Sequence, residues 1–238
     1  SDATLTAGTG PVSFDGTVDA ASSGGFALSV NAGGTTTFAQ AVGGTRALKS
    51  IATSGGGTTA INGGSVTTSG IAGQVYGDAV EIGGSDATLT AGTGPVSFDG
   101  TVDAASSGSF ALSVNAGGTT SFGQAVGGTH ALKSLATSGG GTTRINGGSV
   151  TTSGTAGQVY GDAVEIGVSD ATLTSGTGPV SFNGTIDAAS SGGFGLSVDA
   201  GGTTSFAQAV GGTRALKSLA TSGGGTTSIN GPSVTTSG

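Results

Sequence analysis

Hydrophobic and polar residues alternate along short runs of the chain, and glycine-rich segments separate these runs. The alternation is clear in residues 3–6 (Ala-Thr-Leu-Thr) and 26–31 (Phe-Ala-Leu-Ser-Val-Asn). A period of two, carried by β-branched and aromatic residues, is typical of half-buried β-strands. Glycine suits the corners between strands because it adopts positive φ angles without strain. The pattern therefore predicts an all-β protein built from short strands and tight corners.

The same pattern returns at a long period. The run at residues 1–6 recurs at 85–90 and again at 169–174, so the two steps are equal. The first two copies differ only at the pairs Gly25/Ser109, Thr37/Ser121, Ala39/Gly123, Arg46/His130, Ile51/Leu135, Ala60/Arg144, Ile71/Thr155 and Gly84/Val168. The sequence thus predicts three repeat units, 1–84, 85–168 and a shorter 169–238, in one continuous body.

Each unit contains four places where an aromatic residue or isoleucine is followed, four or five residues later, by valine. With four such places in each 84-residue unit, their mean spacing is about 21 residues. This spacing is a typical length for one coil of a β-solenoid. We therefore predict a parallel β-helix of roughly eleven coils, forming a rod of roughly 50 Å at ~4.8 Å per coil. The predicted core stack consists of Phe14, Phe38, Ile61, Tyr76, Phe98, Phe122, Ile145, Tyr160, Phe182, Phe206 and Ile229.

Composition narrows the possible functions. Gly 52, Thr 38 and Ser 32 make up about half of the 238 residues, which without the period would suggest a disordered chain. The absence of cysteine excludes a disulfide scaffold and a thiol-ligated metal. The sequence contains no run of ~20 apolar residues, so it does not predict a helix that spans a membrane. A net charge of −7 argues against a nucleic-acid partner.

Three segments carry a resemblance to a known family. Residues 34–38 (Gly-Thr-Thr-Thr-Phe), 62–68 (Asn-Gly-Gly-Ser-Val-Thr-Thr) and 74–80 (Gln-Val-Tyr-Gly-Asp-Ala-Val) resemble the repeats of filamentous-haemagglutinin-like bacterial surface adhesins. The resemblance extends over the entire chain. It implies a right-handed coil, export by a two-partner or autotransporter route, and an extracellular location on the bacterial cell surface.

The repeat and the resemblance together lead to an expected function. We expect an extracellular structural or adhesive rod, the stalk or fibre of a large adhesin, and not an enzyme. The expected partners are other copies of the repeat, end to end or laterally, and host or surface glycans. The chain begins in phase and stops within a unit, so we expect it to be a window from a longer array. The alternative is an extracellular filament whose subunits join end to end by pairing of strand edges.

Single residues add little to this expectation. His130 occupies the position of Arg46 and Arg214, which indicates an exposed surface position and not a catalytic one. Carboxylates four residues apart could cleave glycosides, as in a polysaccharide-degrading β-helix enzyme, although Asp-Gly and Asn-Gly also mark turns, which is the interpretation we favour. These pairs are Asp15 with Asp19, Asp99 with Asp103, and Asn183 with Asp187.

Two further alternatives concern ligands. We expect no cofactor; the alternative is structural calcium at Asp78 and Glu81, and again at Asp162 and Glu165, because calcium prefers oxygen ligands. Threonine-rich runs make ice binding a further alternative. It is less favoured, because the unequal number of residues between successive coils would disrupt a regular array of threonines. Lys49, Lys133 and Lys217 are expected to pair with acids on adjacent coils.

Overall fold

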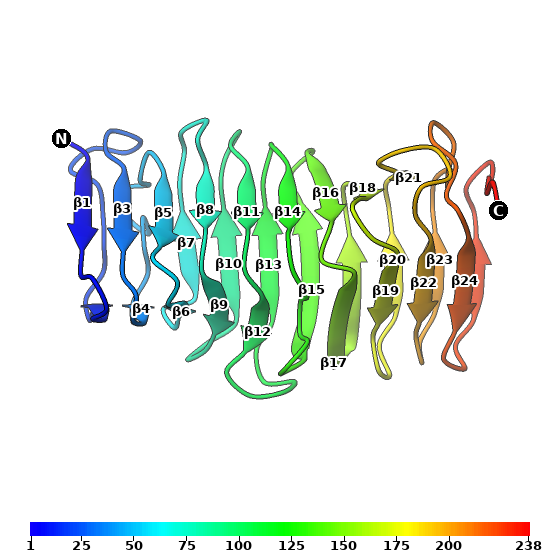
Figure 1. The fold of residues 1–238 in the computed structure, drawn as a ribbon, viewed down its shortest axis with the longest axis horizontal. Coiled ribbons are helices and arrows are strands. Elements are labelled where there is room, and N and C mark those ends of the chain that lie inside the picture. Colours follow the sequence, from blue (N-terminus) through cyan, green and yellow to red (C-terminus); the bar gives the residue numbers. More distant parts are fainter.

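The chain forms a β-solenoid. The computed structural model describes all 238 residues, and all of its regular elements are β-strands. They wrap around one axis as about 10 turns of about 23 residues each. In Figure 1 successive coils follow one another along the long axis, with the two termini at opposite ends. No helix is present that could cross a membrane. The predicted parallel β-helix is thereby confirmed, whereas the coil length predicted from the sequence is too short.

Three faces of parallel strands form the walls of the solenoid. The first face contains β1 (Ala3–Thr6), β3 (Leu28–Asn31), β5 (Ile51–Ser54), β8 (Gln74–Tyr76), β11 (Val96–Phe98), β14 (Thr120–Phe122), β16 (Thr142–Ile145), β18 (Ala163–Ile166) and β21 (Ile186–Ala188). The second begins with β2 (Val12–Phe14), β4 (Thr36–Phe38), β6 (Thr58–Ile61), β9 (Ala79–Ile82) and β12 (Val102–Ala104).

The third face starts at isolated bridges between Val18, Val42 and Val66. It then runs through β7 (Ser65–Thr67), β10 (Ala87–Thr90), β13 (Leu112–Asn115), β15 (Leu132–Ser138), β20 (Val180–Phe182), β23 (Thr204–Phe206) and β25 (Thr227–Ile229), with the second half of β17 (Ser149–Tyr160) between β15 and β20. The first half of β17 continues the second face, which ends with β19 (Ala171–Thr174), β22 (Leu196–Asp199) and β24 (Leu219–Ser222). The long strand β17 therefore belongs to two faces because it turns a corner.

Each 84-residue unit makes three and two-thirds coils and not four. From Leu5, three coils on the first face lead through Val30 and Thr53 to Tyr76. The chain then crosses the second face in β9 and reaches Leu89, the equivalent of Leu5, in β10 on the third face. One unit therefore crosses eleven faces in succession. Since one coil crosses three faces, a unit makes three and two-thirds coils. This fraction accounts for the observed coil of about 23 residues.

This fraction rotates each repeat relative to the one before. The same four residues, Ala-Thr-Leu-Thr, form β1 on the first face, β10 on the third and β19 on the second. Equivalent residues of successive units are therefore separated by about 18 Å along the axis, at ~4.8 Å per coil, and lie on different faces. The predicted single core stack requires equivalent positions on one side of the rod, and the structure corrects this.

Alternate residues of the strands point inward and form one continuous core. Strands such as β11 and β14 show a buried, half-buried, buried pattern, and 44 buried hydrophobic residues form a single cluster. Aromatic rings stack within it from coil to coil. The ring centroids of Tyr76 and Phe98 are 5.3 Å apart, and those of Phe98 and Phe122 are 5.2 Å apart. This offset stacking is a favourable arrangement for aromatic pairs.

The residues of the predicted core stack lie in three stacks, one per face. Phe14, Phe38 and Ile61 follow one another on the second face. Tyr76, Phe98, Phe122 and Ile145 follow on the first, and Tyr160, Phe182, Phe206 and Ile229 on the third. Nine of these eleven side chains are buried, whereas Phe14 is half-buried in the first coil and Ile229 is 54% exposed in the last. The single column that we expected is absent because successive units are rotated.

Glycine is required where the corners of adjacent coils approach each other. A Cβ atom on Gly57 would collide with the carbonyl oxygen of Gly34, and one on Gly141 would collide with that of Gly118. The corner at Gly84 has a φ of +67°. In the next repeat Val168 occupies this position with a φ of +54°, the one non-glycine residue with a positive φ. A β-branched residue is strained in this region, so Val168 stores local strain.

Candidate functional site

Aspartates organise a loop in every repeat. The Oδ1 atom of Asp103 accepts hydrogen bonds from the backbone N–H groups of Thr129 (2.8 Å) and His130 (3.0 Å) on the next coil. Asp19 and Asp187 hold the equivalent loops in the same way. Donation by Arg46 and then Thr45 lowers the pKa of Asp19, because these N–H groups stabilise the charged carboxylate. These carboxylates are thus engaged in loop structure.

The carboxylates spaced four residues apart have separate partners. Asp15 accepts a hydrogen bond from the hydroxyl of Ser13 (2.6 Å), and Asp99 accepts one from Ser97 (2.7 Å). Asp19 and Asp103 instead bind backbone groups of the next coil. Asp15 and Asp99 therefore contact their own strand, and Asp19 and Asp103 contact a loop of the next coil. The turn interpretation concerned the Asp-Gly positions and did not predict the contacts of Asp19 and Asp103 with that loop.

The proposed calcium ligands also lie in different environments. Asp78 is 4% exposed, and its Oδ1 atom accepts a hydrogen bond from the N–H of Gly56 (2.7 Å) at a corner of the preceding coil. Glu81 is exposed on β9. Asp162 repeats the contact of Asp78 through Gly140 (2.8 Å). No group of three or more histidine, aspartate or glutamate side chains is arranged to hold a metal ion.

The predicted lysine row forms ion pairs across the coils. The distances from Nζ to the carboxylate are 3.9 Å for Lys49 and Asp2, 3.1 Å for Lys133 and Asp86, and 3.3 Å for Lys217 and Asp170. All six side chains are about half exposed, so each pair contributes little to stability. The sequence predicted pairing with acids on adjacent coils; each acid instead lies two coils away, with one coil between it and the lysine.

A second acidic arrangement was not apparent from the sequence. Glu81 on β9 is the direct neighbour of Asp103 on β12, although the two are distant along the chain. Ala60 on β6 lies on the other side of Glu81. We call Ala60, Glu81, Asp103 and His130 the open acidic row. Three members of the row, Glu81, Asp103 and His130, line a shallow groove of about 240 Å³, together with Thr58, Ala79, Val80, Thr101 and Thr129. The correct coil length, had it been known, would have revealed this neighbourhood.

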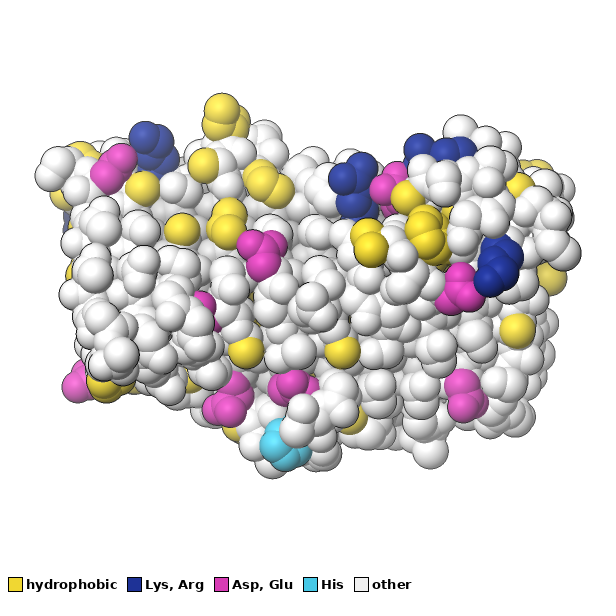
Figure 2. All heavy atoms as spheres, in the orientation of Figure 1, with side chains coloured by type: hydrophobic (Ala, Val, Ile, Leu, Met, Phe, Trp, Pro, Cys, Tyr) yellow, Lys and Arg dark blue, Asp and Glu magenta, His cyan; other side chains and the backbone are white.

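The next repeat contains the same acids with two arginines. Glu165 on β18 neighbours Asp187 on β21 and Arg144 on β16. The Nε atom of Arg144 lies 2.9 Å from one carboxylate oxygen of Glu165, and Nη2 of Arg214 lies 2.5 Å from the other. We call Arg144, Glu165, Asp187 and Arg214 the closed acidic row. In Figure 2 the single histidine (cyan) lies near acidic side chains (magenta) and away from the cationic ones (dark blue).

Buried glutamines form a polar network inside the core. The side-chain nitrogen of Gln74 donates hydrogen bonds to the carbonyl oxygens of Val66 and Thr90, both at 3.0 Å. Its side-chain oxygen accepts one from the hydroxyl of Tyr76 (2.9 Å). Gln158 and Tyr160 repeat the arrangement. Burial raises the pKa of both tyrosines far above the ordinary value of 10.0, because the interior disfavours the phenolate.

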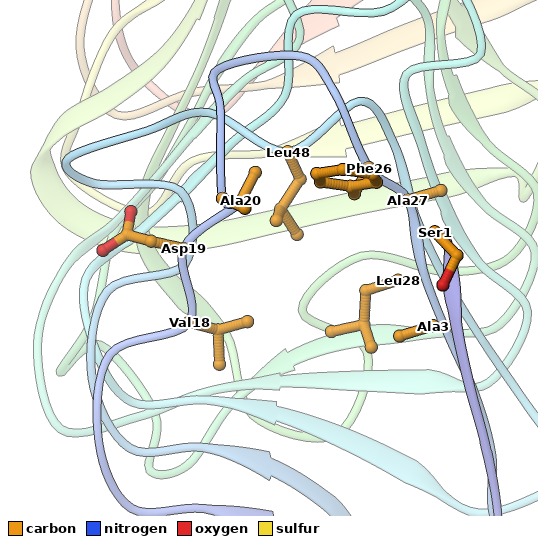
Figure 3. A pocket seen from close by; sticks show the side chains of 10 residues that line it. Ser1, Ala3, Val18, Asp19, Ala20, Phe26, Ala27, Leu28 and Leu48 are labelled. Carbon is orange, nitrogen blue, oxygen red and sulfur yellow. The ribbon is translucent and has the colours of Figure 1, made fainter.

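An apolar pocket of about 330 Å³ opens in the first coil. Figure 3 shows its lining, which includes Val18, Phe26, Leu28 and Leu48. The carboxylate of Asp19 is at its edge and is directed away from the apolar side chains. A ligand site normally combines an apolar lining with converging polar groups, and this pocket lacks such a set. It is better described as the accessible interior of the solenoid.

Comparisons with known proteins provide no further assignment. No protein-family model matches the chain, and neither the curated proteins nor the solved structures contain a match. The fold and the two acidic rows are therefore the observations on which a function can be proposed.

Proposed function

We propose that the protein is an extracellular structural rod, the stalk or fibre of a large bacterial surface adhesin. The observation that carries this proposal is the uninterrupted parallel pairing of strands through all three repeats. Strand β9 of the first repeat pairs with β12 of the second, and β18 of the second pairs with β21 of the third. A rod without internal boundaries is suited to hold another part of an adhesin at a distance.

The contacts of each coil support this role. The extensive contacts of each strand are made within its own coil or with the adjacent coils, and 144 backbone–backbone hydrogen bonds connect the chain. A solenoid with nearest-neighbour contacts can be lengthened by adding repeats without change to its cross-section. Each added unit would extend the rod by about 18 Å, at ~4.8 Å per coil. The number of repeats would then set the reach of the rod.

The rotation of successive repeats affects adhesion along the shaft. Equivalent surface groups return to the same face only after three units, which is eleven coils or about 53 Å at ~4.8 Å per coil. A flat surface would therefore meet an identical patch at every third repeat. Glycans bound along the shaft would benefit from avidity at that spacing.

The surface gives less support to the other functions. The outward row of the first face passes from Ser29 through Ala52 and Val75 to Ser97, and so is not an unbroken row of threonines. Thr53 and Thr59 instead point inward and share a hydrogen bond of 2.8 Å. The carboxylates that the sequence offered for glycoside cleavage accept hydrogen bonds from a serine of their own strand or from a loop of the next coil. We therefore propose a role without catalysis or ice binding.

The test has two parts. Protease treatment of intact cells that produce the protein should remove its repeats, with a cytoplasmic enzyme as the protected control. Insertion of one further copy of residues 85–168 should lengthen the rod by about 18 Å in small-angle scattering, at ~4.8 Å per coil. Repeats protected inside intact cells, or an added copy that does not lengthen the rod, would contradict the proposal.

A second candidate is an extracellular filament of end-to-end subunits. Strands β1 and β2 have a pairing partner on one side only, and the apolar pocket of Figure 3 lies beside β1. Unpaired strand edges can pair with another chain. Negative-stain micrographs of the purified protein distinguish the candidates: fibres that grow with concentration favour the filament, and short particles of constant length favour the stalk.

A further inference from the structure

We propose that the open acidic row binds an arginine side chain presented by a different, basic protein. Glu81 and Asp103 lie side by side on β9 and β12, at a groove of about 240 Å³. No Lys or Arg side chain pairs with either carboxylate within 4.0 Å. Oδ1 of Asp103 accepts hydrogen bonds from the N–H groups of Thr129 and His130, so Glu81 and the remaining oxygen of Asp103 are the acceptors that the groove offers to a cation. This inference goes beyond the structural role, since the groove would bind arginine whether or not the array is a stalk.

The chain itself contains the occupied form of this site. In the closed acidic row Glu165 and Asp187 are the equivalents of Glu81 and Asp103, and the arginines at both positions that differ pair with Glu165. Ala60 replaces the equivalent of Arg144, and His130 replaces the equivalent of Arg214. None of the three cavities of the molecule lies at Glu165. The two arginines cover Glu165, whose side chain is 14% exposed, whereas Glu81 is exposed at the groove of the open row.

The groove is suited to one side chain. Its volume lies below the ~300–1,000 Å³ range of pockets for drug-sized ligands. Thr58, Thr101 and Thr129 add hydroxyl groups around the two acids. A guanidinium group has a planar set of donors that binds carboxylates through two hydrogen bonds, whereas an ammonium group acts as a point charge. The contact of Arg144 with Glu165 shows that this local geometry accommodates a guanidinium group.

Charge indicates that the arginine belongs to another protein. The chain carries a net charge of −7, so two copies repel each other in general. Arg46 donates from its Nε atom to the carbonyl oxygen of Ala20, and Arg144 and Arg214 are both engaged by Glu165. All three arginines of the chain thus have partners within it. A basic protein is attracted to the rod as a whole and to this groove in particular.

The direct test is an NMR titration of the 238-residue protein with N-acetyl-arginine-N-methylamide and with its lysine analogue. We expect the arginine compound to shift the amide signals of Thr101, Thr129 and His130, and the lysine analogue to bind more weakly. The variant Ala60→Arg/His130→Arg should fill the groove from within and weaken binding about tenfold or more, the effect of losing a charge-assisted pair. Glu81→Gln should also weaken binding, without filling the groove.

A mirror variant provides the matched control. Arg144→Ala/Arg214→His should open the closed row and create a second set of shifts around Glu165. Thermal melting of each variant establishes that it is folded. The proposal is overturned by equal shifts in Ala60→Arg/His130→Arg and the parent, or by equal binding of the two analogues. Self-association of the parent that the filling variant abolishes would also overturn it, because the occupant would then be a second copy. None of these outcomes depends on cell-surface location or rod length.

Discussion

The first and second repeats have almost the same sequence but different surroundings. In repeat 1 the strand Ala-Thr-Leu-Thr (β1) pairs with β3 alone, and three of its four residues are exposed. In repeat 2 the identical strand (β10) lies between β7 and β13, and Ala87 and Leu89 are fully buried. The difference shows that burial in this fold comes from the adjacent coils and is not a property of one coil.

The largest expected effect separates these two environments. Phe98 stacks between Tyr76 and Phe122, whereas Phe14 stacks on Phe38 alone and is half-buried. Replacement of Phe98 by alanine should reduce the free energy of unfolding by about 3–5 kcal/mol, the usual cost of an internal cavity. Phe14→Ala should cost roughly half as much or less, since less apolar area is lost.

Urea denaturation followed by circular dichroism measures both changes. If Phe14→Ala and Phe98→Ala destabilise the protein equally, stability does not depend on neighbouring coils in the way that the two repeats suggest.

The buried glutamines test the opposite expectation. Two side chains with equivalent surroundings on different faces should contribute equally to the free energy of unfolding. Gln74→Ala removes three side-chain hydrogen bonds, and Gln158→Ala removes the same three and a longer one of 3.5 Å to the hydroxyl of Thr152. Unpaired buried groups cost about 1–3 kcal/mol each, so both variants should be destabilised by a similar amount in that range or above. The exposed Gln40 provides the control, because Gln40→Ala should change little. Clearly different losses for Gln74 and Gln158 would show that the rotated repeats are not equivalent inside.

Substitutions at the corner of the repeat boundary, Gly84 and Val168, should change the stability of the protein in opposite directions. Val168→Gly relieves a positive φ at a residue that is 75% exposed, so little apolar contact is lost. The relief of about 1–2 kcal/mol is partly offset by the greater freedom of glycine in the unfolded chain, so a net gain of roughly 0.5–1 kcal/mol is expected.

Gly84→Val should destabilise the protein, because a Cβ atom there would lie 2.6 Å from the carbonyl oxygen of Asn62. Melting temperatures of the two variants measure the effect. A stabilising Gly84→Val would contradict the assignment of strain to this corner.

The smallest effect concerns acid pH. The N–H of Ala111 and then the Lys133 ammonium lower the pKa of Asp86 below 3.8, and Gly195 and Lys217 do the same for Asp170. A lowered pKa in the folded state contributes stability above the unfolded value, and this contribution is lost as the pH falls through the folded value. Asp86→Asn should therefore destabilise the protein at neutral pH and progressively less below about pH 4. Thr88→Ala, at an exposed position of the strand that follows Asp86, should show no such dependence; if it does, Asp86 is not the cause.

The sequence was sufficient for the type of fold but not for its pitch. Alternation in residues 3–6, glycine corners and the 84-residue period all indicated stacked parallel strands, and the structure confirms them. The predicted four coils per unit are wrong, because Ile61 and Tyr76 look like successive positions of one column in the sequence. They lie on different faces, since Ile61 pairs with Ile82 and Tyr76 with Thr53. Two positions with similar residues around them in the sequence do not show on which face of the solenoid each one lies.

The acidic rows depend on that missing information. Glu81 and Asp103 become neighbours only because of the exact coil length at this point, which no local motif encodes. The substitutions Ala60/Arg144 and Arg46/His130 were visible in the sequence, but their proximity to these acids was not. That the lysines pair with acids was predictable from the sequence, whereas the separation of two coils between each lysine and its acid was not.

Formation of a disulfide tests the three-and-two-thirds-coil arrangement most directly, since the chain has no cysteine of its own. Ala52 and Val75 are neighbours on β5 and β8 and point outward, so Ala52→Cys/Val75→Cys should oxidise to an internal disulfide. Four coils per unit would instead place Val75 beside Ala60. A disulfide in Ala60→Cys/Val75→Cys and none in Ala52→Cys/Val75→Cys, measured by mass spectrometry, would contradict the rotated arrangement of the repeats.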